Sequence, residues 1–300
     1  MLAALSANGA IAVTKLAAAA TTGSTALLAE GIHSIADTGN QLLLLLGMRR
    51  AKRPPDEEHP FGHGMERFFW TFVVALTLFT VGGLFSMVRG VQGVLHQEET
   101  PGLWLGLGVL TAAAVFEGLA LRVALRSFNR DRGDRSFWAG IRRAKDPETL
   151  TVVFEDIAAL TGIAVAISGL VLGHLFDDSR FDAGAAVLIG VILVGVAFAL
   201  ARESRDLLVG ESASRETRAA ICSAIDAIDE VDEIRDLLTM HVGPEDILVN
   251  VEIAFQDGLD TDGVEDAIRH VERSIREAAP KVAKIFVEPR RPGRADQSST

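Results

Sequence analysis

One stretch of this sequence reads Ala26-Leu27-Leu28-Ala29-Glu30-Gly31-Ile32-His33-Ser34-Ile35-Ala36-Asp37, and a run of leucines, Leu42-Leu43-Leu44-Leu45-Leu46, follows it. Ionisable side chains inside a membrane are costly, so proteins keep them where they pair, bind an ion or line a path. His33 and Asp37 are four residues apart, which places both side chains on one face of a helix. An imidazole and a carboxylate are ligands that suit a transition-metal dication such as Zn²⁺. The stretch therefore predicts an intramembrane metal site, and with it a transporter.

The composition indicates a membrane protein that also carries a soluble part, because 49% of the 300 residues are hydrophobic. A helix needs about 20 mostly apolar residues to cross a bilayer. Six segments fit this length, at about 8–28, 30–48, 69–90, 102–122, 150–174 and 183–201. The sequence thus predicts an α-helical membrane protein with six transmembrane helices in residues 1–203. A soluble domain (204–289) and a disordered tail (290–300) are expected to follow.

The loops between the predicted spans differ in charge. Two of them are rich in basic residues: Arg49, Arg50, Lys52 and Arg53 in one, and Arg126, Arg130, Arg132, Arg135, Arg142, Arg143 and Lys145 in the other. The positive-inside rule places these loops in the cytoplasm, and six spans then place both termini there as well. The first span has no basic segment before it and contains Lys15, which is unlike a signal peptide. A compact six-span plan without targeting segments favours a bacterial inner membrane.

Several functional classes are disfavoured by the sequence. Cys222 is the single cysteine, which excludes an intramolecular disulfide and a cysteine-cluster metal site. The net charge is −11, and no basic stripe lies outside the membrane-flanking loops, so nucleic acid is not an expected partner. The chain contains no His-Glu-x-x-His and no Gly-x-Ser-x-Gly motif, and no nucleophile stands beside His33 and Asp37. We therefore expect neither an enzyme nor a prosthetic group.

Beyond about residue 202 the apolar runs shorten and acidic residues accumulate. The apolar residues of 215–228 and 261–278 have helical spacing, whereas 234–242, 247–255 and 284–288 read as strands. The predicted order is α-β-β-α-β, a small ferredoxin-like sheet backed by two helices in the cytoplasm.

A second polar cluster lies in the basic loop after the second predicted span. The segment reads Asp56-Glu57-Glu58-His59-Pro60-Phe61-Gly62-His63-Gly64. Asp56, His59 and His63 could form a metal site, although the proline and glycines keep the segment out of a helix, so spacing alone does not fix the geometry. The alternative is that the histidines are caps or solvated side chains.

Together these features resemble the cation diffusion facilitator family, over residues from about 8 to 289. The most specific match is the segment from Gly23 to Thr38, which contains His33 and Asp37. The resemblance implies homodimers in the lipid bilayer that exchange a divalent metal, usually Zn²⁺, for protons. It also implies a tetrahedral site with two ligands from the second span and two from the fifth, and a cytoplasm-facing site at the loop with Asp56, His59 and His63.

The fifth predicted span departs from the family pattern. Asp156 matches one ligand, but Val152, which cannot bind metal, stands four residues earlier where the family commonly has another. A variant branch of the family carries a Glu-Asp pair here, and this chain resembles it through Glu155 and Asp156. Adjacent residues point about 100° apart on a helix, so Asn40, Thr151 or water are alternatives to Glu155 as the fourth ligand. A shell rich in carboxylates would also admit Mn²⁺ or Fe²⁺, and Cd²⁺ is a further candidate cargo.

The leading hypothesis is a proton-coupled exporter of divalent metal that works by alternating access. Metal and protons would compete for the same imidazole and carboxylates. A transport-inactive scaffold or metal sensor is the alternative, motivated by Val152 and a histidine-poor tail. Lys15 is expected to snorkel or to pair with an acid, and Glu30, on the face of His33, to have an orienting or entrance role.

Overall fold

A computed structural model describes residues 2–96, 102–132 and 147–290 of the chain. The predicted disordered tail beyond Arg290 and the basic residues of 133–146 lie outside the described residues. The chain divides into two compact units, one formed by Met1–Arg50 with Glu66–Arg205 and the other by Ala51–Met65 with Asp206–Thr300. Each unit has its own apolar core.

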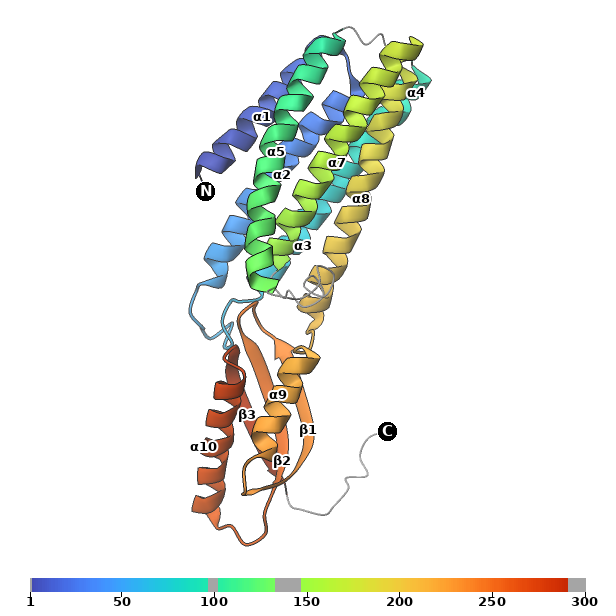
Figure 1. The fold of residues 1–300 in the computed structure, drawn as a ribbon. Helices are drawn as coiled ribbons and strands as arrows, with labels where there is room; N and C mark the ends of the chain where they lie inside the picture. The colour runs from blue at the N-terminus through green and yellow to red at the C-terminus, as the bar shows by residue number, and fades with distance from the viewer. Residues whose placement is uncertain (1, 97–101, 133–146, 291–300) are drawn as a thin grey trace. The chain divides into compact units, whose positions relative to one another are not determined.

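The first unit is a bundle of long helices (Figure 1). Its helices are α1 (Leu2–Thr22), α2 (Thr25–Ala51), α3 (Glu66–Thr77), η1 (Leu78–Leu84), α4 (Phe85–Leu95), α5 (Leu103–Arg132), α7 (Pro147–Phe176) and α8 (Arg180–Val209). α3, η1 and α4 follow one another without a break, and η1 is a π-helical segment. The bundle therefore places α2 and α7, which carry the predicted ligands, in one unit.

Four helices of the described chain are long and apolar enough to cross a membrane: Glu66–Leu95, Leu103–Arg126, Thr151–Phe176 and Arg180–Val209. They correspond to the last four of the six spans expected from the sequence. The other two predicted spans fall on the helices α1 and α2, of which α2 does not meet the same criterion. α2 contains Glu30, His33 and Asp37 and carries Arg49 and Arg50 in its last turn, and these residues lower its mean hydropathy. Two of them, His33 and Asp37, are predicted metal ligands.

The first two predicted spans need a correction at their shared boundary. The segment 8–28 is not one helix, because α1 ends at Thr22 and α2 begins at Thr25. Gly23 has a φ of +68°, a conformation that glycine adopts without steric cost and that ends the helix. The Ser24 hydroxyl then accepts a hydrogen bond from the Leu27 N–H at 3.1 Å, as an N-cap does.

An acid from a distant helix completes this cap. Asp182 of α8 accepts hydrogen bonds from the Ser24 hydroxyl at 2.8 Å and from the Thr25 and Ala26 N–H groups at 2.6 and 3.3 Å. A carboxylate at a helix N-terminus is stabilised by the unsatisfied N–H groups and by the helix dipole. The start of α2 is thus fixed by a residue 158 positions away in the sequence.

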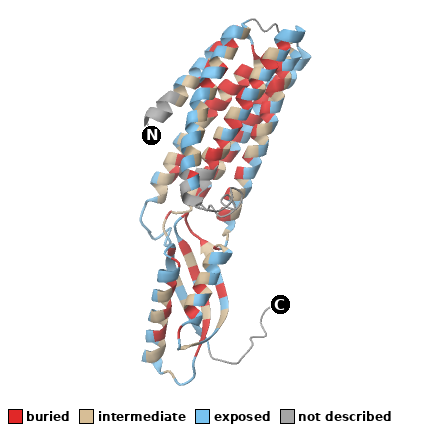
Figure 2. Ribbon diagram, in the orientation of Figure 1, coloured by how far each residue is buried: buried red, intermediate tan, exposed pale blue. Residues whose placement is uncertain are grey.

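The core of the bundle is built from small and branched apolar residues. Buried positions run along α7 and α8 (Figure 2) and include Ala158, Ile163, Ala186, Ile189 and Leu193. Small residues allow helix backbones to approach closely where lipid offers no hydrophobic driving force between helices.

The second unit contains α9 (Arg215–Asp226), β1 (Val231–His241), β2 (Ile247–Phe255), α10 (Thr261–Ala278) and β3 (Val282–Arg290). The sheet has the order β1-β2-β3, with β1 antiparallel and β3 parallel to the central strand β2. Alternate residues of β2 are buried, and they form one core with the apolar residues of the two helices: Ile247, Val249, Val251, Ile253, Ile221, Ile225, Ala267, Val271 and Ile275. The order α-β-β-α-β agrees with the order expected from the sequence.

The loop 51–65 belongs to this second unit and not to the helical bundle. A Cβ added at Gly64 would lie 2.5 Å from the Val242 carbonyl oxygen and 2.9 Å from the Gly243 Cα, so only glycine fits against that turn. The Phe61 and Phe286 rings meet edge to face, with centroids 6.4 Å apart. A domain boundary drawn from the sequence near residue 203 does not include this loop in the second unit.

Candidate metal centre

His33 and Asp37 face each other along one side of α2. Their nearest ligand atoms, His33 Nδ1 and Asp37 Oδ1, are 3.4 Å apart, and the two side chains are 1% and 14% exposed. The helix is continuous from Thr25 to Ala51, which gives the four-residue spacing the geometry expected from the sequence. An imidazole and a carboxylate are therefore held together in the interior of the bundle.

Two contacts fix the register between α2 and α7. The Asn40 side-chain amide donates a hydrogen bond to Glu155 Oε1 at 2.7 Å. Ten residues earlier on α2, Glu30 Oε1 lies so close to Gly162 of α7 that an added Cβ would collide with it. α2 and α7 run in opposite directions (Figure 1), and Asn40 marks the level of Glu155. Asp37 precedes Asn40 by three residues, and a helix rises 1.5 Å per residue, so Asp37 lies within about one turn of the level of Glu155 and Asp156.

The two acids of α7 are placed differently. Glu155 is buried, contacts α2 through Asn40, and is near enough to Asp37 for its charge to act on that carboxylate. Asp156 is half-buried, and no hydrogen bond or ion pair in the described part of the chain joins it to His33 or Asp37. The structure therefore places Glu155, the predicted ligand for which the sequence offered alternatives, on the face of α7 that contacts α2.

Several polar atoms of this region are buried without a hydrogen-bond partner among the described residues. They are both ring nitrogens of His33, Asp37 Oδ1, Asn40 Oδ1 and Asp156 Oδ2. Unsatisfied buried polar atoms are costly, and a cluster of them on facing helices fits a site that is completed by a cation. Nitrogen and oxygen donors of this kind suit Zn²⁺ and also Mn²⁺ or Fe²⁺.

A second buried polar network lies one turn from His33. Lys15 Nζ contacts Glu30 Oε2 at 3.2 Å and Ser34 Oγ at 2.8 Å, and the Lys15 and Glu30 side chains are fully buried. The sequence indicates only that Lys15 could snorkel or pair, because its partners lie on another helix. Asp182 likewise gives no sequence signal beyond its position at the start of a predicted span. The structure shows Lys15 paired.

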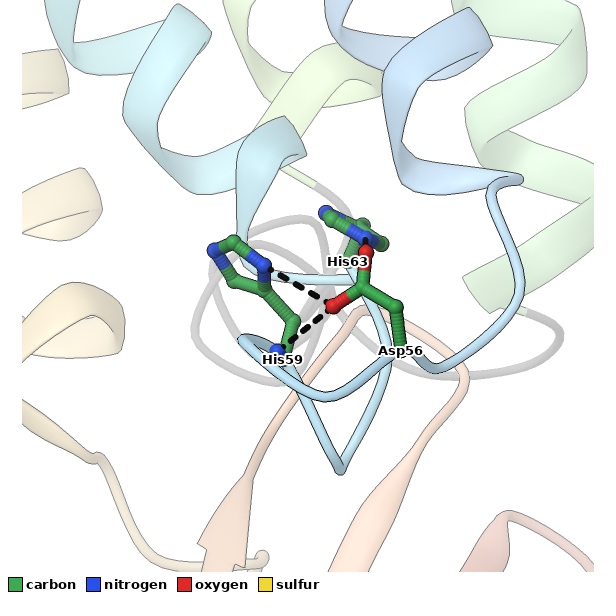
Figure 3. Close-up of side chains that lie close together, drawn as sticks. All are labelled: Asp56, His59 and His63. Atoms are coloured by element: carbon green, nitrogen blue, oxygen red, sulfur yellow. Dashed lines mark hydrogen bonds and ion pairs between the residues drawn. The ribbon is translucent and has the colours of Figure 1, made fainter.

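The loop residues Asp56, His59 and His63 also meet in space (Figure 3). Asp56 Oδ1 lies 3.3 Å from His59 Nδ1, and Asp56 Oδ2 lies 3.0 Å from His63 Nε2. One ligand atom from each of the three residues lies within 4.8 Å of the other two. The arrangement offers one carboxylate and two imidazoles to a single ion, a donor set suited to Zn²⁺.

Backbone turns hold this loop cluster in place. The His59 N–H donates to Asp56 Oδ1 at 2.7 Å, and the Gly62 N–H donates to the His59 carbonyl at 2.9 Å. Gly62 has a φ of +87°, which a residue with a side chain rarely adopts. The hydrogen bond from the His63 ring, followed by that from the His59 N–H, holds the pKa of Asp56 below its usual value.

Comparison with known proteins agrees with these observations. Metal tolerance protein C4 of Arabidopsis thaliana is 29% identical over 237 residues, which cover 78% of this chain and 52% of the relative. The mitochondrial proton-coupled zinc antiporter SLC30A9 of Xenopus laevis is 29% identical over 244 residues, with 80% and 44% covered. The cation-efflux pump FieF of Klebsiella pneumoniae strain 342 is 26% identical over 239 residues, with 79% and 74% covered.

The chain spans about half the length of the metal tolerance and SLC30A9 relatives that it matches. All three of these relatives carry transporter or metal-tolerance names, and none is named as an enzyme. The family model for the cation efflux transmembrane domain matches residues 1–209, which include every helix of the bundle. The chain belongs to the cation efflux family of transporters, also called the cation diffusion facilitators.

Proposed function

We propose that this protein exports a divalent metal cation, with zinc as the leading candidate, in exchange for protons. The observation that carries the proposal is the set of buried, unsatisfied donors on α2, His33 and Asp37, opposite Glu155 of α7. A dication in a membrane needs its charge neutralised and its water replaced, and these side chains supply both anionic and neutral donors. The names of the zinc antiporter relatives support zinc and proton coupling for this chain.

Competition between metal and protons gives the proposed coupling. Imidazole and carboxylates bind metal only when deprotonated, so loading the centre from the cytoplasm releases protons. Protons that arrive from the other side of the membrane would displace the metal there. Alternating access between the two sides then converts a proton gradient into metal export.

For the ligand set we propose His33, Asp37, Asp156 and Glu155. The contact between Asn40 and Glu155 supports an inward position for the Glu155 carboxylate. Asn40 Oδ1 is buried and available as an alternative donor in the described structure. Val152 cannot take part, so the proposed shell has more oxygen than nitrogen and admits Mn²⁺, Fe²⁺ or Cd²⁺ beside Zn²⁺.

A second metal site is proposed at the loop, with Asp56, His59 and His63 as ligands. The spacing of their donor atoms within 4.8 Å supports one shared ion. Because the loop is part of the soluble unit, an ion bound there would act on that unit.

The proposed membrane arrangement has six spans, α1 and α2 included, with both termini in the cytoplasm. Four helices meet the requirements of a span, and the polar residues that distinguish α2 are those proposed to bind metal. We further propose a homodimer in a bacterial inner membrane and a cytoplasmic ferredoxin-like domain from about 204 to 289.

Metal uptake into proteoliposomes tests the function. Purified protein would be reconstituted with an imposed pH difference, and uptake of Zn²⁺, Mn²⁺, Fe²⁺ and Cd²⁺ measured for wild type and Asp37→Ala. We expect proton-driven flux of at least one metal, abolished by Asp37→Ala. Folded protein that moves none of these metals would overturn the proposal and favour a scaffold or sensor of the same fold.

A further inference from the structure

Lys15 is a buried cation with two defined contacts. Its ammonium lies 3.2 Å from Glu30 Oε2 and 2.8 Å from Ser34 Oγ, and its side chain is fully buried. A lysine so far from water is retained only with strong partners, because an unpaired ammonium at this depth is costly. The pairing links α1 to the turn of α2 that immediately precedes and includes His33.

Glu30 shares its helix face with the proposed ligands. It stands three residues before His33 and seven before Asp37, so the three side chains form one row along α2. Its second oxygen, Oε1, is buried without a hydrogen-bond partner in the described structure. Gly162 of α7 leaves the room that this oxygen occupies. Glu30 is therefore a buried carboxylate on the helix face of His33, with one oxygen engaged by Lys15 and the other without a hydrogen-bond partner among the described residues.

The charge of Lys15 also reaches ionisable side chains beyond its direct contacts. It acts on Glu30, on Glu117 of α5, and on Asp37 as well as on His33. Without this cation, the Glu30 carboxylate would be a buried anion next to a site that accepts dications. Such a carboxylate is neutralised either by a proton or by a bound dication, and the second route would make it part of the metal shell.

We propose that Lys15 withholds Glu30 from the metal centre and so fixes which metals the centre prefers. This inference rests on the proposed function. With Lys15 in place, Glu30 orients the turn that carries His33 and stays outside the shell. Without Lys15, Glu30 adds a third or fourth carboxylate, and oxygen-rich shells favour Mn²⁺ relative to Zn²⁺. Lys15 is thus a positioning residue that determines specificity without touching the metal.

The test is the ratio of Mn²⁺ to Zn²⁺ affinity, measured by competition with a metal-sensitive dye. The full chain would carry His59→Ala and His63→Ala, so that only the membrane centre responds. We expect Lys15→Met to shift the ratio toward Mn²⁺ by about tenfold, the scale on which outer partners act on metal sites. Lys15→Met combined with Glu30→Gln is expected to restore the parent ratio, and Lys15→Arg to keep it.

A helix packing role for Lys15 would give a different pattern. Lys15→Met would then weaken both metals equally, and Glu30→Gln would not restore the ratio; either result overturns the inference. If Lys15→Met does not fold, Ser34→Ala decides, since it removes one of the two contacts of the ammonium. It should shift the ratio in the same direction by a smaller factor, whereas Thr38→Ala, one turn along α2, should not. An unchanged ratio in Ser34→Ala would count against the inference.

The parent protein and Asp37→Ala separate this inference from the proposed function. If the parent binds neither metal, both the function and the inference fail. If the parent binds metal and Asp37→Ala does not, the proposed metal centre stands, the Lys15 variants test the inference alone, and the flux assay tests export.

Discussion

At the scale of single residues, the candidate centre is defined by side chains that the fold buries without satisfying. Asn40 shows this most clearly, because its amide nitrogen is engaged by Glu155 while its oxygen has no partner in the described structure. Such half-satisfied groups are rare in protein interiors and concentrate at functional sites. The role of Glu155 therefore decides how the centre is completed.

Glu155→Gln should lower Zn²⁺ affinity by about tenfold or more, because a neutral amide replaces an anionic donor facing α2. Glu117→Gln is the matched control: its charge also acts on Asp37, but it lies on α5 and is not a proposed ligand. Its effect should be several-fold smaller. Isothermal titration of the two variants against wild type measures the difference, and equal losses would remove Glu155 from the ligand set.

The loop cluster gives a prediction for pH. The pKa of Asp56 in the folded protein lies below its usual value, which is about 3.9 in an unfolded chain. Its stabilising contribution is therefore fully present above about pH 4 and is lost as the pH falls through the folded pKa. Thermal unfolding of wild type and Asp56→Asn, from pH 3 to pH 7 without metal, should show a constant gap in Tm above pH 4 that closes below it. A gap that widens on acidification would contradict this assignment.

At the scale of elements, α2 is the helix on which the site depends, and its start is fixed from outside. Asp182 accepts three hydrogen bonds at the α2 N-terminus and is 1% exposed. Because this contact joins the first residues of α2 to α8, it sets the position of the whole helix and of the ligands on it.

Replacing Asp182 by Ala should destabilise the bundle by about 1–3 kcal/mol, because buried N–H groups lose their acceptor. Asp182→Asn keeps one carbonyl oxygen and should cost less. Asp257→Ala, at an exposed turn of the soluble unit, is the control and should be within about 0.5 kcal/mol of wild type. Unfolding of the three variants in detergent ranks them, and an Asp182→Ala protein as stable as wild type would show that the cap is dispensable.

Elements with a strong hydrophobic period can be predicted from the sequence, whereas contacts between elements cannot. β2 (Ile247–Phe255) and α10 (Thr261–Ala278) have the bounds that their apolar spacing predicts, since alternate burial and a single apolar face leave a clear pattern. The break at Gly23 does have a local signal, the polar run Thr21-Thr22-Gly23-Ser24-Thr25, but the apolar stretches beyond this run on both sides favour one continuous span. The partner of Lys15 and the cap from Asp182 are tertiary contacts, which no local pattern reports.

At the scale of the whole molecule, the proposed six spans place both ends of the chain on the same side of the membrane. The proposed arrangement places the α7–α8 turn outside the cell and the soluble unit inside. Ser179, half-buried in that turn, and Ser223, exposed on α9, are nearly isosteric with cysteine and report on the two sides.

In a Cys222→Ser background, which has no other cysteine, Ser179→Cys should react with a membrane-impermeant maleimide on intact cells. Ser223→Cys should react only after the membrane is permeabilised. Mass shifts on a denaturing gel measure both, with labelling of lysed cells as the control for expression. Labelling of Ser223→Cys in intact cells would refute the proposed orientation.

The loop that carries Asp56, His59 and His63 has a consequence for modularity. Gly64 fits against Val242 and Gly243, and Phe61 meets Phe286, so two separate segments of the chain build the second unit. A fragment that begins after residue 205 would lack the loop 51–65, which packs against it. Recombination between relatives could not exchange the C-terminal segment alone, because the matching loop between α2 and α3 would have to be exchanged with it.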